Sequence, residues 1–130
     1  MPIISLQLDE DLLDRFNKVK NKRGYTSKSK AIRDSIIEFI DNYEKFDDLK
    51  GYKMMTINLI YPIEVGLLSE VSEICDKYRS LIKTMMDWRI ASKKIEIILT
   101  VGEVDTIKDF YNELIRIKDI TSTIHEIIIE

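Results

Sequence analysis

The chain has 130 residues, of which 45% are hydrophobic and 33% are charged, and its formal net charge is −3. This balance is typical of a globular protein and argues against an intrinsically disordered chain. No apolar run is long enough to cross a bilayer, and the N-terminus lacks the pattern of a signal peptide. The single cysteine, Cys75, cannot form an internal disulfide, so we expect a protein of the reducing cytoplasm.

Alternating apolar residues open the chain. Ile4, Leu6 and Leu8 are separated by Ser5 and Gln7, and this period of two predicts a half-buried strand. A lone short strand leaves its backbone N–H and C=O groups without partners. A second copy of the chain would supply those partners, so we infer an obligate dimer in which the two strands pair antiparallel.

Two amphipathic helices are predicted after this strand. Asp9 is a suitable N-cap for the first helix, and Gly24 favours its end because glycine accepts the left-handed conformation. Thr26, Ser27 and Ser29 offer caps for the second helix. Two short helices bury too little apolar surface to be stable alone, which again favours a dimer. The apolar stripe of the second helix consists of Ala31, Ile32, Ile36, Phe39, Ile40 and Tyr43.

The outward face of the paired strands would carry Ile3, Ser5 and Gln7 from each chain. A two-stranded ribbon fits the major groove of B-DNA. Glutamine can bond an adenine edge in two places, serine can bond several bases, and isoleucine can pack on a thymine methyl group. In isolation, Ser5 and Gln7 would rather be interpreted as ordinary surface residues of a strand.

Basic residues gather between Arg15 and Arg33, a window that contains no acidic residue. A local excess of positive charge indicates a nucleic-acid contact better than the net charge does. A solvated helix face is the alternative interpretation of such a run. The basic residues of the window are Arg15, Lys18, Lys20, Lys22, Arg23, Lys28, Lys30 and Arg33.

Three segments together resemble the ribbon-helix-helix repressors, and in particular the nickel-responsive regulator family NikR. They are Ile4–Leu13, Arg23–Tyr25 and Ser29–Asp34. The resemblance implies that a dimer binds double-stranded DNA, that Ile3, Ser5 and Gln7 read bases, and that the start of the second helix clamps a phosphate. A helix N-terminus attracts a phosphate through its free N–H groups and its positive dipole end. The phosphate-binding residues so implied are Ser27, Lys28, Ser29, Lys30 and Arg33.

Two positions depart from the pattern of this family. Many relatives carry Glu where Lys30 stands, which completes a capping box. Lys30 gives up that bond and opposes the helix dipole, but a cation is useful beside a phosphate. The family often has Arg where Ile3 stands, so we expect one guanine contact to be missing.

Residues 52–130 predict a second domain of the ferredoxin-like or ACT-like kind, in the order βαββαβ. The overall fold class is therefore α+β, with a ribbon-helix-helix domain over residues 1–46 and a linker over residues 47–51. The predicted strands are Tyr52–Tyr61, Leu81–Ile90, Lys94–Val101 and Ser122–Ile129, with helical stripes from Leu67 to Tyr78 and from Ile107 to Ile117.

One sheet face of such a domain is left bare by the two helices. Thr84, Met86, Trp88 and Ile90 share one side of their strand and are too apolar, as a set, to face water. If they face the helices they belong to the core, and if they face away they imply another subunit. The resemblance favours the second option, because the second domains of the family assemble back to back and join two dimers into a tetramer. Met86 and Trp88 are then interface residues.

The resemblance also raises the question of a metal. The nickel site of the family uses three histidines and one cysteine, and the corresponding positions here are Cys75, Met86, Trp88 and Lys94. Tryptophan cannot ligate nickel and lysine is a poor ligand at neutral pH, so we carry over no metal ligand and expect no nickel response. A thiol and a thioether would suit Cu(I), although a buried inert thiol is the commoner case. The lone His125 is expected to be a structural or surface residue.

A turn before the first helix of the second domain suggests a small-molecule effector. The run from Pro62 to Val71 resembles the strand-to-helix turn at which ACT domains bind amino acids, and it contains Glu64, Gly66 and Leu67. Glycine would let the backbone approach a ligand, and a helix N-terminus favours a carboxylate. The alternative is a plain helix start.

Three classes of function compete for this sequence. A transcriptional regulator, most simply a repressor, agrees with all the patterns above. An antitoxin is the second possibility, although its tail would be short and disordered until bound, and a metal-responsive regulator with altered nickel or copper ligands is a variant of the first. An enzyme is not expected, because the sequence contains no nucleophile–base pair, phosphate loop or cluster of His, Cys and carboxylates.

Overall fold

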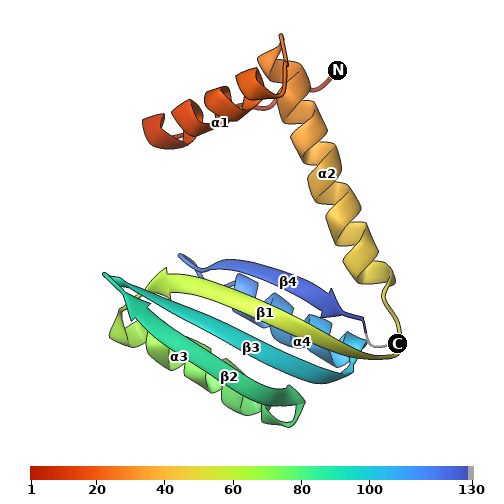
Figure 1. Ribbon diagram of the computed structural model, residues 1–130, viewed down its shortest axis with the longest axis vertical. Coiled ribbons are helices and arrows are strands. Elements are labelled where there is room, and N and C mark those ends of the chain that lie inside the picture. Colours follow the sequence, from red (N-terminus) through yellow and green to blue (C-terminus); the bar gives the residue numbers. More distant parts are fainter. Residues whose placement is uncertain (129–130) are drawn as a thin grey trace. The chain divides into compact units, whose positions relative to one another are not determined.

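The computed structural model describes residues 1–128 and divides the chain into two compact units. The first unit spans Met1–Asp47, and the second begins at Asp48. The first unit contains two helices, α1 (Glu10–Lys22) and most of α2 (Lys28–Asp48) (Figure 1). Because α2 runs to Asp48, the first two residues of the linker predicted over residues 47–51 are helical.

The helix ends follow the predicted capping residues. The Asp9 carboxylate accepts the N–H of Leu12 at 2.7 Å, which satisfies one of the free donors at the start of α1. Gly24 follows α1 with a φ of +78°, the left-handed conformation expected of it. The Ser27 hydroxyl accepts the N–H of Lys30 at 3.3 Å, so Ser27, and not Thr26 or Ser29, caps α2.

The strand predicted over residues 4–8 is not formed in the single chain, and its pairing with a second copy stays a prediction. Residues 1–9 contain neither helix nor strand, and Ile4 and Leu6 are 83% and 70% exposed. A strand exists only when its backbone groups pair with a neighbouring strand, and within residues 1–128 this segment finds no such neighbour. A strand here therefore requires a partner strand from outside the described residues of this chain.

The second unit is a four-stranded antiparallel sheet with two helices on one face (Figure 1). The order of the strands in the sheet is β2-β3-β1-β4, which agrees with the predicted split βαβ topology. The elements are β1 (Tyr52–Pro62), α3 (Val65–Lys77), a 3-10 turn (Arg79–Leu81), β2 (Ile82–Ile90), β3 (Lys93–Glu103), α4 (Val104–Ile115) and β4 (Thr121–Ile127).

Each of the four predicted strands differs from the structure in at least one bound: β1 ends at Pro62, β3 spans Lys93–Glu103 and β4 begins at Thr121. The strand predicted from Leu81 begins at Ile82, because Leu81 ends the 3-10 turn and is buried. The strand predicted over Ser122–Ile129 ends at Ile127, and Ile129 lies outside the described residues.

Alternation along the strands separates the two faces of the sheet. Odd-numbered residues of β1 and even-numbered residues of β3 are buried beneath the helices, and Ile57 lies opposite Ile98 in the register. The helices contribute a continuous apolar stripe, and the Phe110 ring lies 5.1 Å from that of Tyr78. The buried side chains of α3 and α4 are Leu67, Val71, Cys75, Val104, Ile107, Phe110, Tyr111 and Leu114.

Truncation of a core residue tests this packing. Leu114→Ala is expected to lower the free energy of unfolding of the second unit by about 2–5 kcal/mol, because the side chain is fully buried and leaves a cavity. Chemical denaturation followed by circular dichroism measures this loss. Val65→Ala, at a position 86% exposed, is the control and should change the value by less than about 0.5 kcal/mol. Equal effects of the two substitutions would contradict the assigned core.

Candidate nucleic-acid interface

The N-terminal segment lies along an apolar groove between α1 and α2. Ile4, Leu6 and Leu8 line this groove, whereas Ile3, Ser5 and Gln7 do not and are exposed. The two sets therefore take different sides of the segment, as the period of two predicts. The helices contribute Leu12, Leu13, Phe16, Ile32, Ile36 and Phe39 to the lining.

The groove leaves a large apolar surface uncovered in a single chain. Leu12, Ile36 and Phe39 are 47%, 45% and 62% exposed, although such side chains normally form a core. Ala31 is the one residue of α1 and α2 that is buried. A contiguous apolar surface of this kind marks a site of association.

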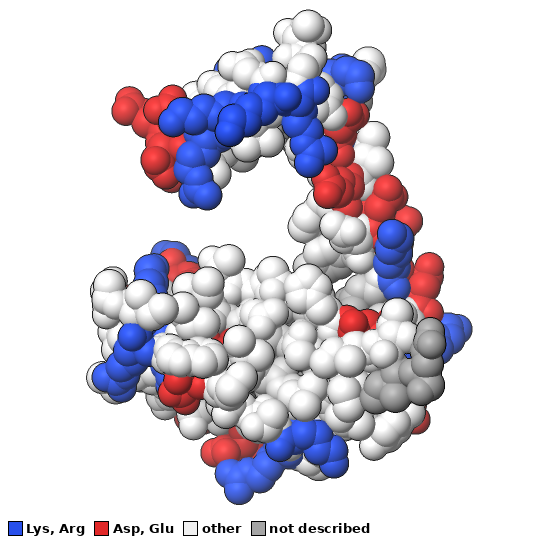
Figure 2. All heavy atoms as spheres, in the orientation of Figure 1, with Lys and Arg blue, Asp and Glu red and all other residues white. Residues whose placement is uncertain are grey.

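Lysine and arginine side chains gather on the first unit (Figure 2). Acidic residues stand at the start of α1 and basic residues follow them along the helix. Ser27, Lys28, Ser29 and Arg33 are exposed at the start of α2, where no acidic residue occupies the first turn. This helix end thus presents free N–H groups and positive charge to solvent.

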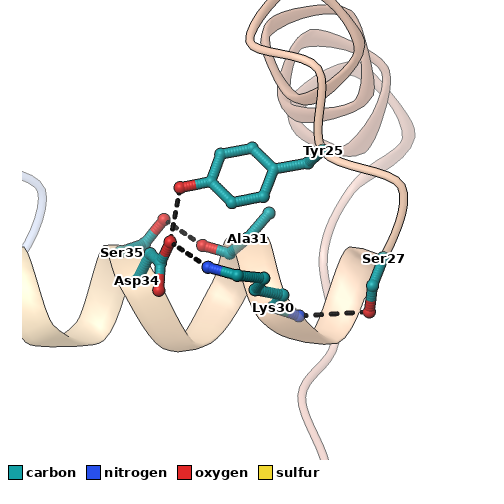
Figure 3. Close-up of polar contacts among 6 residues, drawn as sticks. All are labelled: Tyr25, Ser27, Lys30, Ala31, Asp34 and Ser35. Carbon is teal, nitrogen blue, oxygen red and sulfur yellow. Dashed lines mark hydrogen bonds and ion pairs between the residues drawn. The ribbon is translucent and has the colours of Figure 1, made fainter.

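Lys30, however, is held by neighbouring side chains (Figure 3). Its ammonium lies 3.1 Å from the Asp34 carboxylate and 5.4 Å from the centre of the Tyr25 ring. The Tyr25 hydroxyl donates to the same carboxylate oxygen at 2.5 Å. Sequence reasoning missed Tyr25 and Asp34 as partners, although the spacing of Lys30 and Asp34 is that of an ion pair on a helix face.

The same contacts set the protonation of the cluster. The hydrogen bond from Tyr25, followed by that from Lys30, lowers the pKa of the Asp34 carboxyl. The reciprocal effect raises the pKa of the Tyr25 hydroxyl. Asp34 therefore remains ionised at neutral pH and keeps both donors in place.

The structure adds no feature of a ligand site to the predicted effector turn at Glu64–Leu67. Leu67 is buried in the core of the second unit, whereas Glu64 and Gly66 are exposed. Glu64 is the N-cap of α3 but makes no side-chain capping bond. A side-chain carbon added at Gly66 would meet nothing within 4 Å, so no close approach requires a glycine there.

The four positions at which the resemblance places nickel ligands lie on two faces of the sheet. Met86 and Trp88 pair with Ile97 and Ile95 on the open face, and are 50% and 46% exposed. Cys75, a residue of α3, is buried on the other face. Lys94 lies on that face too, 3.3 Å from the Glu96 carboxylate. Burial, followed by the nearby Glu96 charge, raises the pKa of the Cys75 thiol to about 12. Among residues 1–128, no three His, Cys, Asp or Glu side chains come together as a metal site.

The open face of the sheet is largely uncharged (Figure 2). Thr84, Met86, Trp88 and Ile90 stand on this face, so the alternative in which they fill the core is wrong. His125 also stands on this face of β4, opposite Thr56. Further apolar residues of the open face are Met54, Ile60, Ile95, Ile97, Leu99, Val101 and Ile127.

Comparison with known families divides the chain as the fold does. Residues 3–43 match the ribbon-helix-helix proteins of the copG family. Residues 54–127 match the NikR C-terminal nickel-binding domain. Within residues 1–128, no helix has the length and apolar character that spanning a membrane requires.

Relatives of similar length match most of the chain. Proteins named "Putative nickel-responsive regulator" from Methanococcoides burtonii and Dictyoglomus turgidum are 34% and 35% identical to it. The first match covers 90% of this chain and 85% of the relative, and the second covers 91% and 88%. An uncharacterized protein from Thermotoga maritima has the fold of the second unit, with a TM-score of 0.56 and 12% sequence identity. The match covers 58% of this chain and 98% of that protein.

The fold and these matches define a DNA-binding transcriptional regulator of the ribbon-helix-helix class, not an enzyme. Within that class, the chain belongs to the NikR family of nickel-responsive regulators.

Removal of one hydroxyl tests the cluster around Lys30. Tyr25→Phe is expected to raise the pKa of Asp34 toward its ordinary value, because the largest cause of the lowered pKa is lost. The ionised Asp34 carboxylate stabilises the fold above its ordinary pKa, and this stabilisation is lost as pH falls through the pKa of the folded state. In Tyr25→Phe this contribution should be smaller. Carboxyl-detected NMR titration measures this pKa. Tyr43→Phe, elsewhere on α2, should leave it unchanged, and an unaltered Asp34 in Tyr25→Phe would refute the assignment.

Proposed function

We propose that this protein is a repressor that reads the major groove with a β-ribbon formed by two copies of its N-terminal segment. The apolar groove that Ile4, Leu6 and Leu8 line carries the proposal, because the first unit of a second copy would present the same apolar surface to it. Pairing of the two segments would give their backbone groups partners and leave Ser5 and Gln7 outward. Since its target is DNA, the protein would act in the cytoplasm.

Phosphate contacts are assigned to the start of α2. The exposed N–H groups after Ser27, together with Lys28, Ser29 and Arg33, form a positive helix end that suits a phosphate. Lys30 joins this set only if it exchanges Asp34 for a phosphate oxygen. These contacts would fix the position of the ribbon without reading sequence.

A tetramer is the proposed assembly of the second units. The open face of the sheet carries Met86, Trp88 and Ile90 at 46–59% exposure, and its apolar character continues across β3 and β1. Covering such a face removes a large apolar area from water, which favours association. The folded second unit also argues against an antitoxin, whose tail would lack a sheet of its own.

Nickel is not the proposed ligand of the second unit. The residues at the corresponding positions include an indole, an ammonium that is paired with Glu96, and a buried thiol. Metal ligation requires a lone pair and, for cysteine, the thiolate. The Cu(I) alternative fails on the same geometry, since Cys75 and Met86 lie on opposite faces of the sheet. An effector at Glu64–Leu67 stays a prediction.

Two substitutions separate base reading from phosphate binding. Gln7→Ala should weaken binding to a selected operator by about 1–3 kcal/mol and leave random duplex nearly unaffected. Arg33→Ala should weaken binding to both duplexes and reduce the slope of log affinity against log salt by about 1. Fluorescence anisotropy across a salt series, on an operator selected from random DNA, measures both effects.

Arg116→Ala is the matched control for these experiments. Arg116 is an exposed arginine that caps the end of α4 in the second unit. Its loss should leave binding to both duplexes unchanged. If Gln7→Ala and Arg33→Ala also behaved like the parent, the assigned DNA contacts would be wrong.

A charged side chain placed in each proposed interface should disrupt that interface and leave the other one intact. Leu6→Glu is expected to abolish the ribbon dimer, and Trp88→Glu is expected to convert tetramers to dimers, because each places a carboxylate in an apolar contact. Sedimentation velocity measures the two states. Gln7→Glu, one residue along on the outward side, should keep the parent assembly. A monomeric parent would contradict the proposal outright.

A further inference from the structure

A charged cluster is buried on the helix-covered face of the second unit. The Tyr61 hydroxyl of β1 donates to Oε1 of Glu96 at 2.5 Å, and the Lys94 ammonium lies 3.3 Å from the same oxygen. The Glu96 side chain is 4% exposed and that of Lys94 is 19% exposed. We call these three residues the lysine cluster.

The carboxylate of this cluster needs a cation beside it. Glu96 is buried, and its Oε2 atom has no hydrogen-bond partner among the described residues. Asp87 lies directly across from Glu96 on β2, which adds a second negative charge on the same side of the sheet. A buried carboxylate is tolerated only when charge pairing offsets the loss of its hydration. Lys94 supplies that pairing.

Lys94 and the nearby Cys75 stand at positions where the resemblance places nickel ligands of the NikR family. Lys94 stands at one such position and is part of the lysine cluster, and Cys75 stands at another and interacts electrostatically with both Glu96 and Lys94. Any divalent cation here would meet a fixed ammonium, which repels it and offers it no lone pair.

We propose that the Lys94 ammonium is the built-in cation of this site, in place of the divalent metal that the family name implies. The Glu96 charge is then paired without a metal, and the DNA binding of the protein does not depend on nickel. This inference rests on the proposed function for its DNA-binding consequence alone. The charge balance itself concerns only the second unit.

Nickel retention and DNA binding test the metal half of this proposal. The full chain, stripped with a chelator, is dialysed against Ni(II) and analysed for bound metal, and its affinity for a selected operator is measured with Ni(II) and with chelator. We expect no stoichiometric nickel and the same affinity in both conditions. One nickel per chain, or a nickel-dependent affinity, would overturn the proposal.

A double-substitution cycle tests the charge half. Lys94→Met should lower the unfolding temperature of the second unit, because it leaves the buried Glu96 charge unpaired while it retains most of the side-chain bulk. The same substitution in the Glu96→Gln background should cost much less, since no buried charge remains. Lys94→Arg, which keeps the positive charge, should preserve most of the parent stability. If Lys94→Met cost the same in both backgrounds, Lys94 would not be the cation of this site.

The two failures can be told apart. A parent chain that bound no specific DNA with or without nickel would overturn the proposed function. The nickel content and the double-substitution cycle would still decide between a built-in cation and a metal, because neither measurement involves DNA.

Discussion

The first unit depends on a surface that a single chain leaves unmatched. Among the described residues its N-terminal segment finds no strand to pair with, and the groove that this segment lines exposes side chains such as Phe39 at 62%. Unpaired backbone and uncovered apolar surface both carry a free-energy cost in water. One operation, the association of two copies, would remove both costs and would also place Ser5 and Gln7 outward. In this arrangement stability and DNA recognition share one cause.

The second unit uses the two faces of one sheet differently. The face beneath α3 and α4 is a closed core that contains Ile57, Ile98 and Phe110 at 0% exposure. The open face is apolar as well, but no described element of the second unit covers it. The same strand period therefore yields a stable unit on one side and a candidate surface for assembly on the other.

Charged residues in both units are held by partners that the sequence analysis missed. Lys30 was predicted to contact phosphate from its place at a helix start, yet it pairs with Asp34 beneath the Tyr25 ring. Lys94 was judged only as a poor metal ligand, yet it neutralises Glu96 in the interior. Tyr61 and Glu96 are 35 residues apart and meet because β1 and β3 are neighbours in the sheet. The Tyr61–Glu96 contact could not be predicted, since strand order, rather than spacing along the chain, brings these two residues together.

Local chemistry in the sequence by itself determined the caps at Asp9 and Gly24, the order of the elements and the alternation of Ile4, Leu6 and Leu8 with Ser5 and Gln7, because these depend on neighbours within a few residues. The strand at Ile4–Leu8 could not be decided locally, since its hydrogen bonds must come from another strand. Only the tertiary structure decided that Met86 and Trp88 face away from the core and that Lys94 meets a buried carboxylate. The physical reason is the same in each case: the packing of α3 and α4 on the sheet decides which face is buried, and with it the surroundings of every side chain on that face.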